Sequence, residues 1–286
     1  PAAAAHLGLG PGTRVAVGLI DAHAGALAAL GGFAGASDRM GRNLALIAGT
    51  STCLMRLGPA AAARPGVWGP YPDGLLPGYA VTEGGQSASG ALLDHLLSAF
   101  GGREPDAALH ARVAARIAEL RAEDPDLAPG LHVLADFHGN RTPRTDPRAR
   151  GAIHGLELDG GFDGLCRLYF RAAVALAIGL RETLEALDPA GEVEALHAAG
   201  GHARNPLLMS LYADAAGLPV LEPRSPDPML LGAAMAAATA GGIYPDLAAA
   251  AQAMGQGGVP RRPDPAAAAR FARDRAALDR LRAAAG

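Results

Sequence analysis

The sequence predicts a mixed α/β protein, with one sheet that carries helices on both of its faces. Three observations predict this class. Short apolar runs that end at glycine or an acid alternate with longer stretches of helical spacing. From residue 44 onward, three strands with hairpin character precede several helices and then a strand–helix–strand–helix order. Half of the residues are hydrophobic but only 4% are aromatic, so we expect a sizeable core of closely packed small side chains.

The first third of the chain supplies several of the expected strands. Residues 13–20, TRVAVGLI, form an apolar run that ends at Asp21 and predicts a buried strand. Residues 22–32 then predict a helix that ends at glycine. The apolar runs 44–50 and 52–58, with a Thr-Ser turn between them, predict a hairpin. We expect a third strand over 78–83 and loops over 33–42 and 59–77.

Helices dominate the rest of the chain. The stretches 205–217 and 227–242 each place proline early and glycine at or just past the end, which is typical of helices. Residues 138–151 predict a polar loop. We expect helices over 86–100, 104–124, 162–187, 205–217, 227–242 and 265–285, and strands over 131–137, 194–201 and 218–223.

Composition excludes several classes of protein. A net charge of −3 and a pI of about 6.3 argue against nucleic-acid binding, which needs a basic face. All 25 positively charged side chains are arginine, so the lysine of a Walker phosphate loop and the strand lysine of protein kinases are both absent. If this protein handles ATP, backbone amides and a metal must therefore bind the phosphates.

Cysteine usage and hydropathy indicate the cellular setting. Cys53 and Cys166 are far apart and neither belongs to a C-x-x-C pair, so we expect no zinc site and no disulfide framework. This usage fits a reduced, cytoplasmic compartment. No apolar run reaches the roughly 18 residues of a membrane helix, and we identify no signal peptide, so no membrane partner is expected. Because the chain begins at Pro1 rather than methionine, we expect it to be the later part of a longer protein.

The segment IDAHAG holds the first candidate for chemistry. Asp21 follows an apolar run, and a carboxylate held at a strand end is suited to act as a general base. The same residue also suits the cap of the helix that follows, and the residues alone leave both interpretations open. Asp21 with His23 would suit a metal-dependent hydrolase, but no third ligand stands at a suitable spacing, so no metal site is predicted.

Three further segments combine glycines with polar residues. The turn AGTSTC, residues 48–53, is either an anion cradle or an ordinary hairpin turn. In TEGGQSASG, residues 82–90, Glu83 ends a strand, two glycines let the chain turn, and a helix follows. Glu83 is suited to sugar hydroxyls and the helix start to a phosphate, although a capped strand–helix turn explains the same residues. In AAGGHARNPLL, residues 198–208, glycines would let a nucleotide lie against the backbone, but the G-x-G-x-x-G fingerprint is absent.

The order of these four segments resembles the C-terminal part of the FGGY family of carbohydrate kinases, and the likeness runs over nearly the whole chain. IDAHAG is similar to the family's catalytic-aspartate segment, GTS to its phosphate-binding turn, and EGGQSASG and AGGHARN to its substrate- and nucleotide-facing segments. Residues 137–159 and 169–184 resemble its central block. EGGQSASG and FHGNR are most similar to the ribulokinase and pentulose kinase branch. The resemblance implies an actin-like, ribonuclease H-like ATPase fold.

The resemblance also implies a role for each candidate residue. Asp21 would remove the proton from the sugar hydroxyl that attacks the γ-phosphate of ATP, and Glu83 would face a ketopentose such as D-ribulose. Mg²⁺ would neutralise the phosphates. The implied nucleotide-binding residues are Gly49 and Thr50 near the β- and γ-phosphates, Gly90 near a phosphate, and Gly200, Gly201 and Asn205 on the ADP side.

A first domain is absent from this resemblance. Members of the family begin with a domain that carries an Asp-Gly-Thr phosphate loop and most of the sugar contacts, and no D-G-T occurs here. We therefore expect residues 1–32 to be the end of that N-terminal domain and residues 33–286 to be the C-terminal kinase domain. Such a fragment should phosphorylate little or nothing alone.

Other interpretations stay open at this point. The chain could be a non-catalytic nucleotide-binding or interaction module on the same fold, either a half-protein or a pseudokinase. Retention of Asp21, Thr50 and Glu83 together favours the kinase. The residues do not identify the sugar, because Glu83 is a single polar contact, and they leave a homodimer open as a further assembly.

Overall fold

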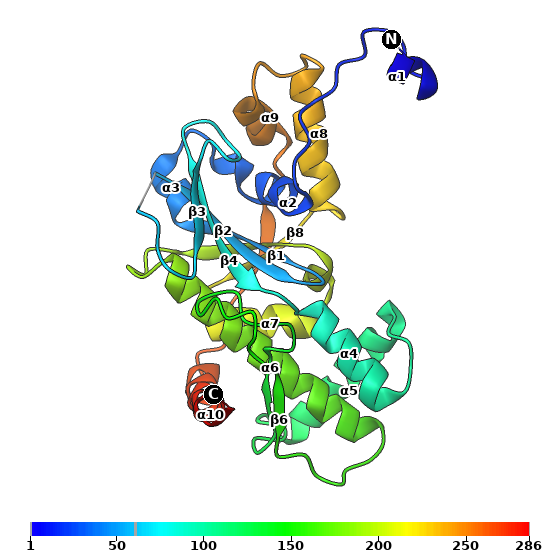
Figure 1. Ribbon diagram of the computed structural model, residues 1–286, viewed down its shortest axis with the longest axis vertical. Coiled ribbons are helices and arrows are strands. Elements are labelled where there is room, and N and C mark those ends of the chain that lie inside the picture. The colour runs from blue at the N-terminus through cyan, green and yellow to red at the C-terminus, as the bar shows by residue number, and fades with distance from the viewer. Residues whose placement is uncertain (1, 60–61, 286) are drawn as a thin grey trace.

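A seven-stranded mixed sheet forms the centre of the protein (Figure 1). The computed structural model describes residues 2–59 and 62–285. Its strands are β1 (Asn43–Ala48), β2 (Thr52–Gly58), β3 (Trp68–Pro72), β4 (Ala80–Gln86), β5 (His132–Leu134), β6 (Ala152–His154), β7 (Ala195–Ala199), β8 (Val220–Pro223) and β9 (Gly258–Arg261). The main sheet has the order β3-β4-β2-β1-β7-β8-β9, and β5 pairs with β6 in a separate two-stranded sheet.

The centre of the sheet combines both kinds of strand pairing. β1 runs antiparallel to β2 and parallel to β7, which in turn runs parallel to β8. β4 is antiparallel to both β2 and β3, and β9 is antiparallel to β8. The predicted hairpin over 44–58 and the mixed sheet are therefore confirmed.

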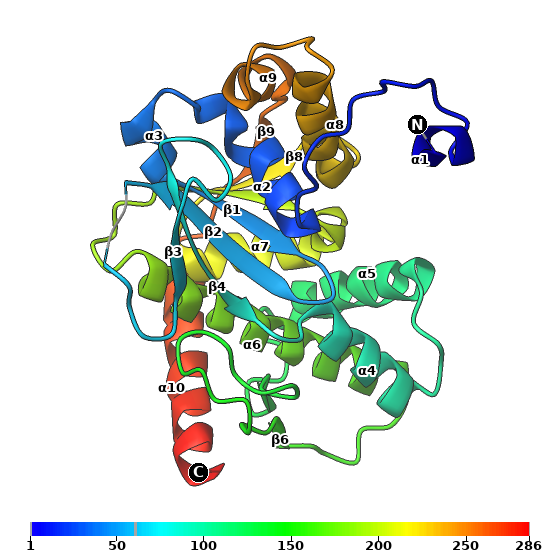
Figure 2. The ribbon, with the colours of Figure 1, turned by 45° about the horizontal axis from the view of Figure 1, so that its top comes forward.

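Helices cover both faces of this sheet, as the sequence predicts (Figures 1 and 2). One face carries α2 (Asp21–Leu30), α8 (Pro228–Ala240) and α9 (Leu247–Met254). The other face carries α4 (Gly90–Gly101), α5 (Ala107–Glu123), α6 (Phe162–Leu187), α7 (Pro206–Ala216) and α10 (Ala267–Ala285). The remaining short helices are α1 (Ala2–His6), η1 (Gly31–Phe33), α3 (Ser37–Gly41) and η2 (Gly201–Arg204). Within the described ranges, no helix combines the length and apolar character that a membrane crossing needs.

Alternate side chains of the central strand divide the hydrophobic core into two parts. Leu44 and Leu46 of β1 enter a large core with α4, α5, α6 and α7. Ala45 and Ile47 enter a smaller core with α2 and α9. This period of two is the signature of a strand that is buried on both faces. We call these the α6 face and the α2 face of the sheet.

Local sequence signals set the ends of several helices. Asn205 accepts hydrogen bonds from the amides of Leu207 and Leu208, and Pro206 occupies the first turn of α7. Gly217 ends the helix in the left-handed conformation, with φ of 67°. The 26-residue helix α6 also coincides with the predicted range 162–187, because its apolar positions recur over seven turns against the large core.

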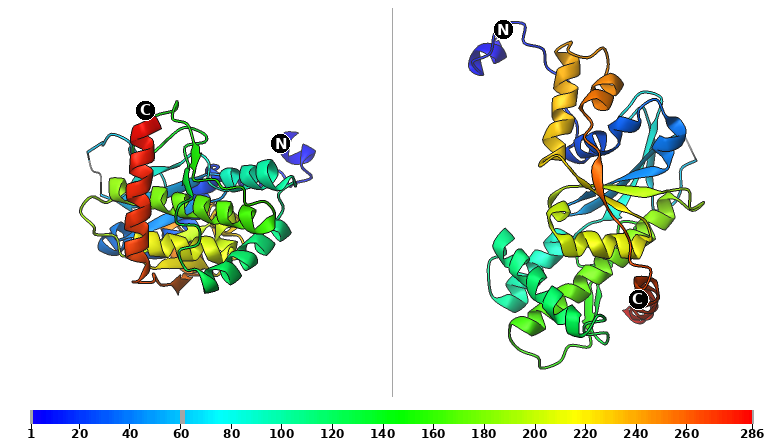
Figure 3. Two further views of the ribbon diagram at one scale, coloured as in Figure 1. Left: turned by 90° about the horizontal axis from the view of Figure 1, so that it is seen from below. Right: turned by 180° about the vertical axis from the view of Figure 1, so that it is seen from behind.

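The predicted strand over residues 13–20 is wrong. These residues form no strand, and no segment in the described part of the chain pairs with them. Val15 and Val17 are 87% and 89% exposed. An isolated extended segment has no partner for its backbone donors and acceptors, so an apolar pattern alone does not make it a strand. Helix α1, which precedes this segment, projects from the rest of the protein in Figures 1 and 2 and in the right view of Figure 3.

Both edge strands of the main sheet were missed by the sequence patterns. β3 lies in the stretch predicted to be mostly loop and contains Pro70 and Pro72, and β9 contains Pro260. Proline cannot donate to a strand ladder and is tolerated at sheet edges, where one side needs no partner. The short elements α3, α9 and β6 were also not predicted.

Candidate active site

A cavity of about 950 Å³ opens where the parallel strands β1 and β7 end. Helices α4, α5, α6 and α7 and the short helix η2 form its walls. Ligands of open α/β sheets bind at this edge, beyond the carboxyl ends of parallel strands. Five of the predicted nucleotide-binding residues line this one cavity, and they are Gly49, Thr50, Gly90, Gly201 and Asn205.

Gly200, the sixth predicted nucleotide-binding residue, lies next to the cavity at the end of β7 but does not line it. It has φ of +93°, and a Cβ added to it would come within 2.4 Å of the Ala48 carbonyl oxygen. Only glycine adopts this backbone conformation easily, and only glycine allows β1 and the end of β7 to approach so closely. Gly200 thus acts through the shape of the backbone and does not line the cavity itself.

The Gly49–Thr50 turn rests on the start of α4. The amide of Gly90 donates to the Gly49 carbonyl over 2.9 Å, and the amides of Ser89 and Ala91 donate to the Thr50 carbonyl. A Cβ on Gly90 would lie 2.6 Å from the Gly49 oxygen, so this close approach needs glycine. Within the described residues, the amides of Thr50 and Ser51 donate to no acceptor. Two backbone donors beside a cavity are suited to an anion.

A buried polar chain holds this turn in place. Thr52 Oγ1 donates to Ser89 Oγ over 2.8 Å, and Ser89 Oγ donates to the Gly49 carbonyl over 3.0 Å. His202 shares a 2.9 Å hydrogen bond with the hydroxyl of Tyr212, and its burial lowers its pKa to about 4. His202 Nε2 has no hydrogen-bond partner in the described part of the chain and lies 3.1 Å from the Cβ position of Gly90. A neutral imidazole therefore borders the turn.

A second polar chain lies on the far wall of the cavity. Asp94 shares a 2.8 Å hydrogen bond with His110 Nε2, and His110 Nδ1 shares one of 2.9 Å with the hydroxyl of Tyr169. Beside it, one side of α5 offers small side chains at helical spacing, which leaves a flat apolar wall. The alanines of this wall are Ala107, Ala111, Ala114, Ala115 and Ala118.

Sequence reasoning missed both polar chains. Asp94, His110 and Tyr169 come from three different helices, and no local spacing connects them. His202 directly follows the Gly200–Gly201 pair that was predicted to bind nucleotide. This position was the only feature of the sequence that pointed to His202 as part of the site.

Glu83 lies on the α2 face and not in the cavity. Cys53 Sγ donates to a Glu83 carboxylate oxygen over 3.5 Å. Burial and the neighbouring Glu83 carboxylate raise the pKa of the Cys53 thiol to about 12, so the thiol remains a donor at neutral pH. Trp68 is the register partner of Glu83 on β3, and its side chain therefore leaves the sheet on the same face.

The predicted strand end at Glu83 is wrong. β4 continues through Gly84 and Gly85 to Gln86. A Cβ on Gly85 would lie 2.0 Å from the Thr52 carbonyl oxygen. The two glycines therefore allow β2 and a neighbouring loop to approach closely, and they make no turn.

Asp21 is the first residue of α2, and it is exposed. Its carboxylate accepts from the amide of Ala22 over 2.7 Å, whereas Ile20 occupies the N-cap position. A Cβ on Gly25 would touch Ile47 near the end of β1, and the opposite end of α2 leads to Phe33, whose ring contacts His197 of β7. Helix α2 therefore runs antiparallel to β1 (Figure 2).

This direction sets where Asp21 lies relative to the cavity. One turn before Gly25, it is at the end of the sheet where β1 leads into the Gly49–Thr50 turn. Asp21 and Glu83 thus both lie on the α2 face, and that turn separates them from the cavity. Among the described residues, no group of three or more histidine, cysteine, aspartate or glutamate side chains is placed to hold a metal ion.

Sequence comparison identifies relatives of this chain. The profile of the "FGGY family of carbohydrate kinases, C-terminal domain" matches residues 44–241. A Xenopus laevis FGGY carbohydrate kinase domain-containing protein is 38% identical over 273 residues, which are 90% of this chain and 50% of that protein. A D-ribulokinase of Saccharomyces cerevisiae is 35% identical over 268 residues, covering 83% of this chain and 37% of the relative. A ribulokinase of Mycolicibacterium smegmatis is 38% identical over 259 residues, covering 88% and 44%.

Solved structures give the same result for the fold. A xylulose kinase from Rhodospirillum rubrum superimposes with a TM-score of 0.75 at 30% identity, over 99% of this chain and 54% of that one. A ligand-bound xylulose kinase from Lactobacillus acidophilus has a TM-score of 0.74 at 20% identity, over 98% and 54%. The chain spans between 37% and 54% of the length of these relatives. The predicted actin-like, ribonuclease H-like fold is confirmed, and the chain belongs to the FGGY family of carbohydrate kinases, whose C-terminal domain it contains.

Proposed function

We propose that this chain is the nucleotide-binding and catalytic half of a kinase that transfers phosphate from ATP to a hydroxyl of a ketopentose such as D-ribulose. One observation carries the proposal. Glycines and polar residues from three segments far apart in the sequence converge on one cavity of about 950 Å³ at the ends of two parallel strands. Relatives named ribulokinase and D-ribulokinase support the choice of a ketopentose.

The cavity fits a nucleoside triphosphate in size and in chemistry. Pockets for small ligands and cofactors commonly measure about 300–1,000 Å³. The amides of Thr50 and Ser51 suit the β- and γ-phosphates, and the alanine wall of α5 suits a planar base. Gly200, Gly201 and Asn205 border the side on which ADP would remain.

Mg²⁺ completes this proposal. The ion commonly binds through one or two carboxylates together with substrate phosphates, and it rarely uses a cage made only of protein ligands. The lack of a metal-ligating cluster among the described residues is compatible with an ion carried by the phosphates. When bound, Mg²⁺ neutralises charge on the transferred phosphoryl group.

Residues of this chain would carry out proton transfer, sugar binding and phosphate binding. Asp21 accepts the proton of the attacking hydroxyl as general base, and its exposure on the α2 face leaves it accessible to a sugar. Glu83 accepts hydrogen bonds from other hydroxyls of the sugar. The Gly49–Thr50 turn holds the phosphate end of ATP between the two faces.

On this proposal, residues 1–32 end a preceding domain and residues 33–286 form the second domain. The exposed apolar residues of the 13–20 segment support a partner surface there. The preceding domain would supply the other half of the sugar site, so the chain alone would have little activity. Both cysteines are free thiols, which fits the proposed cytoplasmic location.

Asp21→Asn in the full-length protein tests the proposal. We expect the rate with ATP, Mg²⁺ and D-ribulose to fall at least about a hundredfold, because general-base catalysis contributes roughly 10²–10⁴-fold. Binding of ADP, measured by calorimetry, should change little, because Asp21 lies outside the cavity. A variant that retains its rate would exclude Asp21 as the base. A wild-type protein that binds ADP but phosphorylates no sugar would favour the non-catalytic module.

A further inference from the structure

Arg141 is a positively charged side chain beside the outer strand β3 of the sheet. Its guanidinium carbon lies 4.8 Å from the centre of the Trp68 ring. Trp68 is the register partner of Glu83 in the β3–β4 pair. The charge of Arg141 also reaches Cys53, where it opposes the rise in the thiol's pKa that burial and Glu83 cause. Arg141 therefore lies near the two residues, Trp68 and Cys53, that neighbour Glu83.

Backbone hydrogen bonds fix the loop that carries Arg141. The amide of Thr142 donates to the Gly85 carbonyl and the amide of Gly85 donates to Thr142 Oγ1, both over 3.1 Å. These bonds attach the loop to β4 just beyond the point where pairing with β3 ends at Glu83. On the other side of Arg141, the Asn140 amide donates to the Asp146 carbonyl over 2.8 Å.

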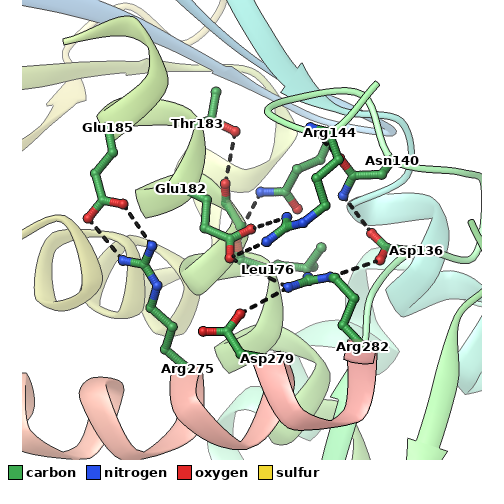
Figure 4. Close-up of polar contacts among 12 residues, drawn as sticks. Asp136, Asn140, Arg144, Leu176, Glu182, Thr183, Glu185, Arg275, Asp279 and Arg282 are labelled. Atoms are coloured by element: carbon green, nitrogen blue, oxygen red, sulfur yellow. Dashed lines mark hydrogen bonds and ion pairs between the residues drawn. The ribbon is translucent and has the colours of Figure 1, made fainter. Parts of the chain in front are cut away.

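Buried acids anchor the same loop to the helices behind it (Figure 4). Arg144 donates two hydrogen bonds, of 2.8 and 3.1 Å, to Glu182 of α6, which is only 6% exposed. Asn140 donates to Asp136 over 2.8 Å. Arg282 of α10 lies 3.7 Å from both Asp136 and Glu182. The loop is thus held on two sides, and Arg141 is presented from a fixed backbone.

Arg141 differs from Arg144 in having no acidic partner. Within the described residues, its guanidinium makes no hydrogen bond and no ion pair, and only the Trp68 ring orients it. A guanidinium can only donate hydrogen bonds, whereas an ionised carboxylate can only accept them. Arg141, above the ring of the residue that pairs with Glu83, and Glu83 itself are therefore complementary to a ligand that offers an acceptor and a donor.

We propose that Arg141 is a specificity-determining residue of the sugar site, which donates to the carbonyl oxygen of a ketose while Glu83 accepts from the neighbouring hydroxyl. This inference rests on the proposed kinase function. A carbonyl oxygen only accepts, and it matches the forked donor. A polyol has a hydroxyl group in place of this carbonyl, and the hydroxyl proton has no acceptor on Arg141. A site built for one hydrogen-bonding pattern discriminates against an analogue with a different pattern.

The test compares a ketose with its matching polyol in the full-length protein. For wild type and Arg141→Met, kcat/KM is measured with D-ribulose and with ribitol. If ribitol is not phosphorylated, its inhibition constant against D-ribulose replaces kcat/KM. Loss of a charge-assisted hydrogen bond should lower the D-ribulose value about 10- to 100-fold. The ribitol value should change less than about threefold, because little of its binding depends on this donor.

A matched control separates this effect from the loss of stacking. The guanidinium carbon of Arg112, a residue of α5, lies 4.2 Å from the centre of the Phe162 ring. Arg112→Met removes a similar cation–aromatic contact and should leave the ratio of D-ribulose to ribitol unchanged. Melting temperatures of all variants monitor folding. If Arg141→Met unfolds, Arg141→Lys decides the matter, because lysine keeps the charge but lacks the planar fork and should lower the ratio several-fold.

Each outcome bears on the proposal. Equal losses with both acceptors, or an unchanged ratio in a folded variant, would overturn the role of Arg141 and leave the kinase function intact. A wild-type protein that phosphorylates no sugar would overturn both. A selective loss with D-ribulose supports the assignment.

Discussion

The two faces of the central sheet are built in different ways. On the α6 face, a cavity is bounded by backbone turns, glycines and buried polar chains that all belong to this chain. On the α2 face, Asp21 is exposed and Glu83 is only partly buried, and the neighbouring segment 13–20 leaves valines in solvent. The Gly49–Thr50 turn is the point where the faces meet. On the proposed function, the α6 face would hold the nucleotide with residues of this chain alone, whereas the α2 face would need a further domain to complete the sugar site.

The largest expected effect tests whether the α6 face really depends on backbone contact. Gly90→Ala would place a Cβ 2.6 Å from the Gly49 carbonyl, which cannot move without displacing the turn. We expect a loss of about 2 kcal/mol in stability and at least about tenfold weaker ADP binding in the full-length protein. Thermal unfolding and calorimetry measure the two quantities.

Gly25→Ala on the α2 face is the matched control. Its Cβ would meet the flexible ends of the Ile47 and Met229 side chains, which can shift. Removing a glycine from a helix interior gains up to about 1 kcal/mol, so the net change in stability should be small. Equal damage from both substitutions would contradict the difference between the faces.

An intermediate effect concerns two buried histidines, one on each face. Burial lowers the pKa of His202 and of His197 from 6.5 to about 4. Below pH 6.5 the unfolded chain binds more protons than the folded one, so stability is fully present above pH 6.5 and falls as the pH drops toward 4. Each histidine should contribute about 2 kcal/mol to the loss between pH 6.5 and 4.5.

Variants assign this pH dependence to its sources. His202→Gln and His197→Gln should each remove about half of the shared slope in denaturant unfolding measured across this pH range. The faces should behave alike here, because burial is the first cause of both shifts. A slope that survives in the double variant would assign the dependence to other groups.

The smallest effect compares two helix caps. Asn205 caps α7 beside the cavity, and Asp246 caps α9 on the α2 face by accepting from the Ala249 amide over 2.8 Å. Replacing either residue with alanine should cost about 1 kcal/mol of stability. Only Asn205→Ala should also weaken ADP binding. Weaker ADP binding in Asp246→Ala would show that the two faces are coupled through the sheet.

The sequence predicted best the elements that carry their own periodicity. α6 is long and strongly periodic, and the central strands end at glycine-rich segments, so these elements were found. The edge strands were missed because their prolines argue against a strand in the sequence. An edge strand tolerates proline, since it pairs with a neighbour on one side only. The run 13–20 has an apolar pattern typical of a strand. It forms no strand because no neighbouring strand in the described part of the chain pairs with it.

The candidate site was predictable only in part. Its glycines and Asn205 could be recognised from motifs, although Gly84 and Gly85 serve close packing and not the expected turn. Contacts such as His110 with Tyr169 join residues 59 positions apart. Such contacts depend on how helices pack across the sheet, which no local spacing encodes.

The prolines of β3 and β9 have a further consequence for how copies of this protein meet. An exposed edge strand is a template on which another chain can add, and this is a common route to aggregation. Pro70 and Pro72 at one edge and Pro260 at the other each remove one backbone donor from the row that such an addition would use. The sheet therefore resists growth from either side. Concentrated protein should accordingly resist forming fibres.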